Sequence, residues 1–192
     1  MAIKVMQINT NHCRASHDLI MQLMAKGEVG VCCLSEPWRV PASHPHWLPS
    51  TDSLAAVKWN PDFIKLTSSV FYRNNNIIGV RFGDLGVISV YISPNSSISD
   101  FLTFSDRLSD AIGSAGGPLI ICGDFNAKSV LWGSPLTNGR GKILEGLADQ
   151  HDLDLMNIGN KPTCVRPQGS FHHRPHMGLC LLCQPHPELA HK

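Results

Sequence analysis

The chain has 192 residues, of which 43% are hydrophobic and 16% are charged. This composition excludes an intrinsically disordered protein, and the length suits one domain whose core buries roughly 70% of the unfolded surface. Sixteen lysines and arginines stand against fifteen aspartates and glutamates. The resulting net charge of +1 does not by itself indicate a nucleic-acid-binding protein.

The sequence predicts a soluble, intracellular protein. Its N-terminus has no apolar stretch long enough for a signal peptide, and no run of about 18 apolar residues predicts a transmembrane helix. The seven cysteines are an odd number, and the adjacent Cys32 and Cys33 lie within an apolar run. Such cysteines are typical of buried, reduced thiols rather than of a disulfide framework.

Hydrophobic patterning alternates between strand and helix signals along the chain. Apolar residues at helical spacing predict helices, and short apolar or alternating runs predict strands. In chain order these are strand 3–9, helix 14–26, strand 29–35, a loop over 36–51, strands 54–59 and 69–72, a hairpin of 76–82 with 86–93, helix 99–112, strand 118–122, helix 139–151 and strand 153–156. This order contains no internal repeat and predicts a single α/β domain with mixed sheets.

Polar residues stand at the carboxyl ends of several predicted strands, where α/β folds place their sites. They are Asn9 and Asn11 after the first strand, Glu36 after the second, Tyr91 and Asn95 at the end of the hairpin, and Asp124 and Asn126 after strand 118–122. Carboxylates and carboxamides together form an oxygen-rich site. Such a site suits Mg²⁺ or Mn²⁺ better than zinc.

Each of these residues also has a simpler interpretation. Asn9 and Asn11 are common turn residues, Glu36 could be a solvated loop acid, and residues 123–126 all favour turns. An acid directly after a buried strand is harder to explain in this way, because burial of an unpaired carboxylate is costly. The combination therefore favours a functional site.

Four motifs in a fixed order resemble a known family. They are IxxN after the first strand, LSEPW after the second, VYISPN after the hairpin and CGDFNAKSVLWGS after strand 118–122. This order resembles the endonuclease/exonuclease/phosphatase superfamily, and more closely the apurinic-type endonuclease domain of non-LTR retrotransposons. The resemblance covers about residues 3–170, and its most specific part is 123–134 followed by 138–147.

The resemblance implies a four-layer α/β sandwich of two mixed sheets flanked by helices. It implies a Mg²⁺-dependent phosphodiesterase that nicks a double-stranded DNA target in the nucleus, joined in one polyprotein to a reverse transcriptase. A phosphatase of inositol phosphates or lipids is possible within the superfamily, but the GDFNAKSxxWGS stretch gives it no support. From a different class, the alternative is a non-catalytic nucleic-acid-binding remnant.

A role for each polar residue follows from the same resemblance. Glu36 is expected to be the principal metal ligand with Asn11 near the same metal, Asn9 and Asn126 to hold the scissile phosphate, Tyr91 to donate to a phosphate oxygen, Asp124 to orient or deprotonate the attacking water, and Trp132 and Asn95 to bind the DNA. This is sensible chemistry for phosphodiester hydrolysis, since a metal stabilises developing charge while a base delivers the nucleophile.

Two elements of the family pattern are absent from this sequence. One is an aspartate within a Ser-Ile-x-Asp-Leu-Thr-like strand, and the other is a Ser-Asp-His motif. Residues 1–170 are therefore predicted to be an incomplete domain whose last strands are missing. Loss of an acid–base partner lowers a rate by on the order of 10²–10⁴, so activity is in doubt.

Residues 171–192 form an atypical tail rich in histidine and cysteine. Codons compatible with residues 171–179, when read one base later, encode Ser-Ile-Ile-Asp-Leu-Thr-Trp-Ala, so we interpret the tail as out-of-frame sequence. Cys180, Cys183 and His186 offer a zinc site as the alternative, although their spacing matches no common zinc motif.

Overall fold

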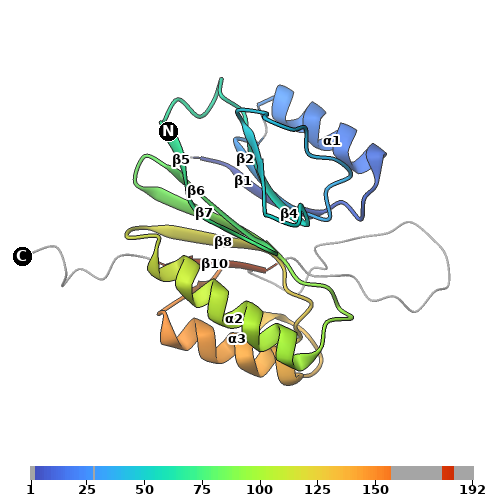
Figure 1. The fold of residues 1–192 in the computed structure, drawn as a ribbon, viewed down its shortest axis with the longest axis vertical. Helices are drawn as coiled ribbons and strands as arrows, with labels where there is room; N and C mark the ends of the chain where they lie inside the picture. Colours follow the sequence, from blue (N-terminus) through green and yellow to red (C-terminus); the bar gives the residue numbers. More distant parts are fainter. Residues whose placement is uncertain (1–2, 28, 157–178, 184–192) are drawn as a thin grey trace, which may run out of the picture.

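The computed structural model describes residues 3–27, 29–156 and 179–183. Two mixed sheets pack face to face, with one helix over the outer face of the first sheet and two helices over the outer face of the second (Figure 1). Helix, sheet, sheet and helix form four layers. The predicted four-layer α/β sandwich is therefore confirmed.

The first sheet has the strand order β1-β2-β4-β3. Its strands are β1 (Val5–Asn9), β2 (Val31–Ser35), β3 (Trp47–Pro49) and β4 (Ala55–Trp59), and helix α1 (Arg14–Ala25) connects β1 to β2. β1 and β2 are parallel, with Asn9 opposite Ser35. The parallel pairing therefore brings the two chain segments that follow these strands to the same edge of the sheet.

The second sheet has the strand order β5-β6-β7-β8-β10-β9. Its strands are β5 (Ser68–Asn74), β6 (Ile77–Phe82), β7 (Leu85–Tyr91), β8 (Leu119–Asp124), β9 (Asp154–Leu155) and β10 (Leu179–Cys183), and its helices are α2 (Ile98–Gly113) and α3 (Gly139–Gln150). β7 and β8 are parallel, with Tyr91 opposite Asp124. This sheet therefore presents a second pair of strand ends.

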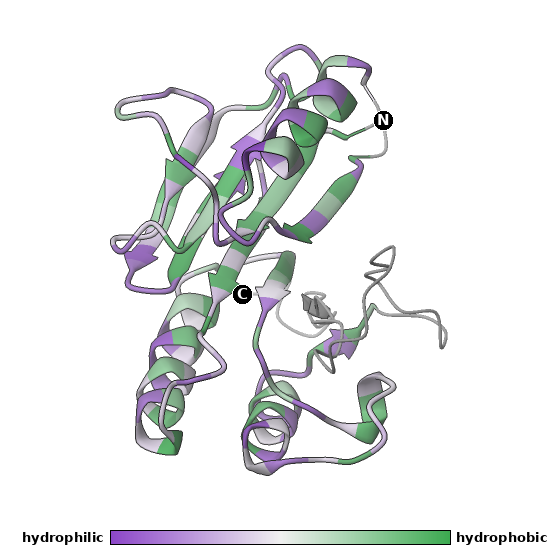
Figure 2. Cartoon of the chain, turned by 90° about the vertical axis from the view of Figure 1, so that its right-hand side faces the viewer, coloured by the Kyte–Doolittle hydropathy of each residue, from purple (hydrophilic) through white to green (hydrophobic). Residues whose placement is uncertain are grey.

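Three hydrophobic clusters hold the layers together: one between the sheets, one under α2 and α3, and one under α1. All residues of β2 and β4 are buried, which explains why β2 is an almost continuous apolar run in the sequence. Figure 2 shows hydrophobic residues along the strands and alternating with hydrophilic residues along the helices. The apolar positions that predict the strands and helices in the sequence are therefore the positions that these elements bury in the core.

Two strands were not predicted. β3 lies within the predicted loop 36–51, because three residues ending in proline carry too short a pattern to be recognised. β10 lies in the tail and pairs with β8 and β9, so the expectation that the sheet ends without a further strand here is wrong. His186 and the remaining tail, on which the zinc alternative depends, lie outside the described residues.

The cysteine prediction is confirmed where the structure describes the chain. Cys32 and Cys33 are buried and free, and burial raises the pKa of the Cys32 thiol to about 12. Among the described residues, no helix has both the length and the apolar character needed to span a membrane.

The outer face of the first sheet carries a cluster of aromatic and basic side chains. The ring of His17, on α1, lies 4.7 Å from the ring of Trp47 and 5.9 Å from that of Trp38, measured between centroids. Lys58 Nζ lies 4.8 Å from the centroid of Trp47. Burial lowers the pKa of His17 and Lys58 lowers it further, while Asp18 opposes the shift.

This environment predicts a loss of stability in mild acid. A histidine whose folded pKa lies below its ordinary value of 6.5 binds fewer protons in the folded than in the unfolded state. The free energy of unfolding should therefore fall as the pH drops below about 6.5. Urea unfolding at several pH values measures this, and His17→Gln should flatten the dependence. An unchanged pH dependence in His17→Gln would contradict the assignment.

Candidate active site

The side chain of Ser35 joins the two sheets at the edge where the parallel pairs β1–β2 and β7–β8 end. Its hydroxyl donates to the carbonyl of Val90 at 3.1 Å and accepts from the backbone N–H of Asp124 at 3.3 Å. Ser35 is fully buried, as is Ser89, which donates to the carbonyl of Leu34 at 3.3 Å. These hydrogen bonds fix the ends of β2 and β8 relative to each other.

Gly123 allows β7 and β8 to approach closely beside this contact. A Cβ atom at this position would overlap with the carbonyl oxygen and the side chain of Val90. Any other residue would push the two strands apart. The glycine of the GDFN motif is therefore explained by the position that it gives to Asp124.

Asp124 ends β8 as a buried carboxylate with only 1% of its surface exposed. Its Oδ2 atom accepts a hydrogen bond from Asn9 Nδ2 at 2.8 Å, and its Oδ1 atom accepts from the N–H of Asn126 at 3.1 Å. The Asn9 side chain is oriented in turn, because its Oδ1 accepts from the N–H of Asn11 at 2.8 Å. Asn9, Asn11, Asp124 and Asn126 are thus linked in one network across both sheets.

Glu36 directly follows Ser35, and its side chain is 18% exposed. Its Oε1 atom accepts from the phenol of Tyr91 at 2.6 Å and lies 3.9 Å from Nε2 of His12. The Glu36 backbone is also fixed, since its N–H donates to Leu54 and its carbonyl accepts from His12 and from the hydroxyl of Thr10. The carboxylate is therefore held at the same edge as Asp124.

The phenol of Tyr91 donates its hydroxyl proton to Oε1 of Glu36. Its contact with a phosphate oxygen stays a prediction. Burial raises the pKa of Tyr91, and the hydrogen bond to Glu36 and the charges of Glu36 and Asp124 raise it further. The phenol therefore stays protonated at neutral pH and acts as the donor that orients Glu36.

Backbone strain is concentrated around these side chains. Asn11, His12, Glu36 and Asn126 have φ values of 46°, 52°, 48° and 47°, which is the left-handed region. They are four of eight such non-glycine residues in the described part of the chain. Each costs about 1–3 kcal/mol, and strain of this kind gathers at functional sites. The clustering supports the candidate site independently of the hydrogen bonds.

Trp132 and Asn95 are not brought into this network. Trp132 is 7% exposed, packs in the cluster under α2 and α3, and donates from Nε1 to the carbonyl of Ala127 at 3.1 Å. The prediction that it binds substrate is therefore not supported by its placement. Asn95 is exposed in the turn after Pro94, where its N–H donates to Ser93 Oγ at 3.2 Å.

Residues 138–147, the second half of the most specific motif, hold the loop after Asp124 in place. Asn138 caps α3 by accepting from Gly141 N at 2.8 Å, and the same oxygen accepts from Lys128 N at 3.1 Å. A Cβ atom at Gly141 would overlap with the carbonyl of Lys128. Asn138 and Gly141 therefore determine where the loop runs.

Arg140 is a structural residue that sequence reasoning missed. It is 8% exposed, and its guanidinium donates to the carbonyls of Ser93 at 3.0 Å and Pro94 at 3.2 Å, and to that of Ser96. Arg140 therefore ties the loop after β7 to the start of α3. The only signal for this role in the sequence is its position two residues after a helix-capping asparagine.

The oxygen atoms of the network suit Mg²⁺. Oε2 of Glu36 accepts no hydrogen bond from any described residue, which leaves one carboxylate oxygen available for a cation. No group of three His, Cys, Asp or Glu side chains in the described ranges could form a closed metal site. Mg²⁺ commonly binds to one or two carboxylates and completes its coordination with water and substrate phosphate. The side chains fit that mode of binding.

The four-layer α/β sandwich, with its carboxylate and amide network at the ends of the central strands, resembles the endonuclease/exonuclease/phosphatase superfamily. Residues 85–173 match the family model described as endonuclease-reverse transcriptase. The fold also matches the endonuclease domain of TRAS1, a telomere-specific non-LTR retrotransposon. That match has a TM-score of 0.74 and 25% identity, over 95% of this chain and 85% of that chain. The predicted resemblance to a retrotransposon endonuclease is confirmed.

Two more distant structures show the same fold. The 3′ phosphatase NExo from Neisseria, bound to a product DNA hairpin, has a TM-score of 0.66 and 14% identity, over 95% of this chain and 87% of that chain. An AP endonuclease from Archaeoglobus fulgidus has a TM-score of 0.64 and 11% identity, over 94% of this chain and 86% of that chain. A comparison with curated proteins gives no match.

The contacts of Ser35 predict an unequal effect of two similar substitutions. Ser35→Ala removes two hydrogen bonds between the sheets, whereas Ser89→Ala removes one. We expect the free energy of unfolding in urea to fall by about 2 kcal/mol for Ser35→Ala and by about 1 kcal/mol for Ser89→Ala. Equal losses would show that the Ser35 hydroxyl has no special role in joining the sheets.

Proposed function

We propose that this chain is a Mg²⁺-dependent endonuclease domain that nicks double-stranded DNA. The observation that carries the proposal is a pair of hydrogen bonds that cross between the two sheets at one edge. Asn9 donates to Asp124, and Tyr91 donates to Glu36. Two structural neighbours support it, since one is a retrotransposon endonuclease domain and another is bound to a DNA product. The endonuclease-reverse transcriptase description supports a reverse transcriptase in the same polyprotein, and hence nuclear DNA as the target.

Glu36 would hold the Mg²⁺ ion through Oε2, with Asn11 at the same edge. A bound Mg²⁺ supplies positive charge that stabilises the charge developing on the scissile phosphate. The part of Tyr91 is to keep the Glu36 carboxylate in one orientation through its 2.6 Å hydrogen bond. In this way the chain would fix the position of the Glu36 carboxylate, the proposed metal ligand, before the substrate binds.

Asp124 would accept the proton of the attacking water. The water oxygen forms a bond to phosphorus, the bond from phosphorus to the leaving oxygen breaks, and that oxygen takes a proton from solvent. Asn9 and Asn126 each donate one amide hydrogen within the protein, to Asp124 and to the carbonyl of Ile92. A carboxamide has two such hydrogens, so each keeps one for a phosphate oxygen.

The sequence contains no Ser-Asp-His motif, so the leaving oxygen has no histidine of that motif to protonate it. We therefore expect a rate about 10²–10⁴ lower than that of a domain with such an acid–base partner. Nicking should still occur, because Glu36 and Asp124 would still supply the metal ligand and the base.

Relaxation of supercoiled plasmid tests the proposal. The chain with Mg²⁺ should produce nicked circles, and EDTA should prevent this. Glu36→Ala and Asp124→Asn should each lower the rate by at least about 10², while Asp149→Asn, an exposed acid on α3, should leave it unchanged. Salt-dependent DNA binding without nicking would instead indicate the non-catalytic nucleic-acid-binding protein.

Tyr91→Phe distinguishes two roles of the phenol. If the phenol orients Glu36, the variant should need a higher Mg²⁺ concentration for half-maximal nicking and should reach a near-normal rate at saturation. If the phenol instead contacts a phosphate oxygen, the rate at saturating Mg²⁺ should fall by about tenfold or more. A Mg²⁺ titration of the two proteins separates these outcomes, and we expect the first.

A further inference from the structure

An exposed tryptophan lies beside the candidate site. Trp38 follows Glu36 by two residues and is 44% exposed, whereas Trp47, Trp59 and Trp132 are at most 7% exposed. Among the described Phe, Tyr and Trp side chains, only Phe63, at 39%, is comparably exposed. Large aromatic rings are mostly buried, so an exposed one at the rim of a catalytic edge needs an explanation.

The Trp38 ring is held in place by the first turn of α1. The guanidinium carbon of Arg14 lies 5.5 Å from the ring centroid, and the His17 ring packs against it edge-on at 5.9 Å. The loop itself is tied to the segment before α1, because His12 Nδ1 lies 3.2 Å from the carbonyl of Pro37. The ring is therefore presented to solvent in one orientation, which lowers the entropy lost on binding a ligand.

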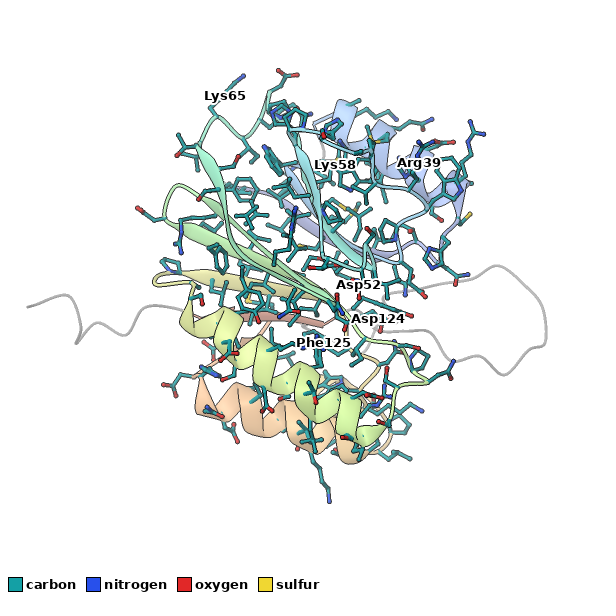
Figure 3. All side chains as sticks on the ribbon, viewed as in Figure 1. Arg39, Asp52, Lys58, Lys65, Asp124 and Phe125 are labelled. Atoms are coloured by element: carbon teal, nitrogen blue, oxygen red, sulfur yellow. The ribbon has the colours of Figure 1, made fainter. Side chains whose placement is uncertain are left out.

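Arg14 contacts this ring, and two further basic residues lie on the adjoining segments. The side chains of His12 and Arg14 are 55% and 74% exposed, and Arg39 is also exposed. Two acids lie near them: Asp18 forms an ion pair with Arg14 at 3.8 Å, and Oε1 of Glu36 lies 3.9 Å from Nε2 of His12. Arg39 extends from the loop beside α1 (Figure 3). An aromatic ring among arginines is the combination that binds a nucleic-acid strand, since guanidinium groups contact phosphates and rings pack on bases or sugars.

We propose that Trp38, Arg14 and Arg39 form the surface that binds the DNA strand next to the scissile phosphate. This inference rests on the proposed function and names where its substrate lies. The strand would pass from Glu36 over Trp38 toward the start of α1. Arg14 and Arg39 contact its phosphates, and the Trp38 ring packs on a base or a deoxyribose.

Fluorescence anisotropy with a short labelled DNA duplex, in EDTA to prevent cleavage, tests the surface. Trp38→Ala should weaken binding by about tenfold, and Trp38→Phe should restore most of the loss. Arg14→Gln and Arg39→Gln should each reduce the slope of log affinity against log salt concentration by about 0.9. Urea unfolding of each variant confirms that the folded protein is being compared.

Two residues at the opposite end of the first sheet serve as matched controls. Phe63 is a similarly exposed aromatic residue, and Lys65 forms a 3.9 Å pair with Asp62 that resembles the pair of Arg14 with Asp18. Figure 3 shows Lys65 far from Asp124. Phe63→Ala and Lys65→Gln should bind DNA as the parent chain does.

The outcomes separate this inference from the proposed function. If Trp38→Ala binds and nicks DNA like the parent, or if the control variants weaken binding equally, the surface is wrong and the endonuclease assignment stands. If binding depends on Trp38 and Arg14 but the parent does not nick, the surface stands and the endonuclease assignment fails. A parent chain that does not bind DNA at all overturns both.

Discussion

The hydroxyl group of Ser35 touches both sheets, and the geometry of the candidate site follows from that contact. Ser35 accepts from the N–H of Asp124, and the next residue along its own strand is Glu36. The two carboxylates come from different sheets, so their separation depends on how the sheets meet. Burial of Ser35 keeps water from competing for these hydrogen bonds, which makes the contact stronger than the same contact at the surface.

Most of the fold follows from local patterns in the sequence. Helical and alternating periodicities predict the individual strands of both parallel pairs and the helices α1, α2 and α3, and strand ends identify Asn9, Glu36 and Asp124. The sequence does not predict the hydrogen-bond partners of these side chains. Tyr91 and Glu36 are 55 residues apart in the chain, and Asn9 and Asp124 are 115 residues apart. Contacts of that range are set by the packing of the sheets rather than by any local pattern.

Many residues of the most specific motif, 123–134 followed by 138–147, hold loops in place and take no direct part in the candidate site. Asn138 and Gly141 fix the path of the loop after Asp124, and Arg140 fixes the loop after β7. Trp132, within the same motif, is part of the hydrophobic core. A match to this motif therefore reports mainly on how the loops around the candidate site are supported, and less on the side chains that face the edge.

The left-handed backbone of Glu36 bears on how this position responds to selection. Glycine adopts a φ of 48° without strain and would make the turn after β2 cheaper to form. Selection for folding alone would therefore replace the glutamate, because its side chain makes the backbone more costly and adds no hydrophobic contact. A glutamate at such a position is what selection for a carboxylate would leave behind, so the strain at Glu36 is the outcome expected if its carboxylate holds the proposed metal.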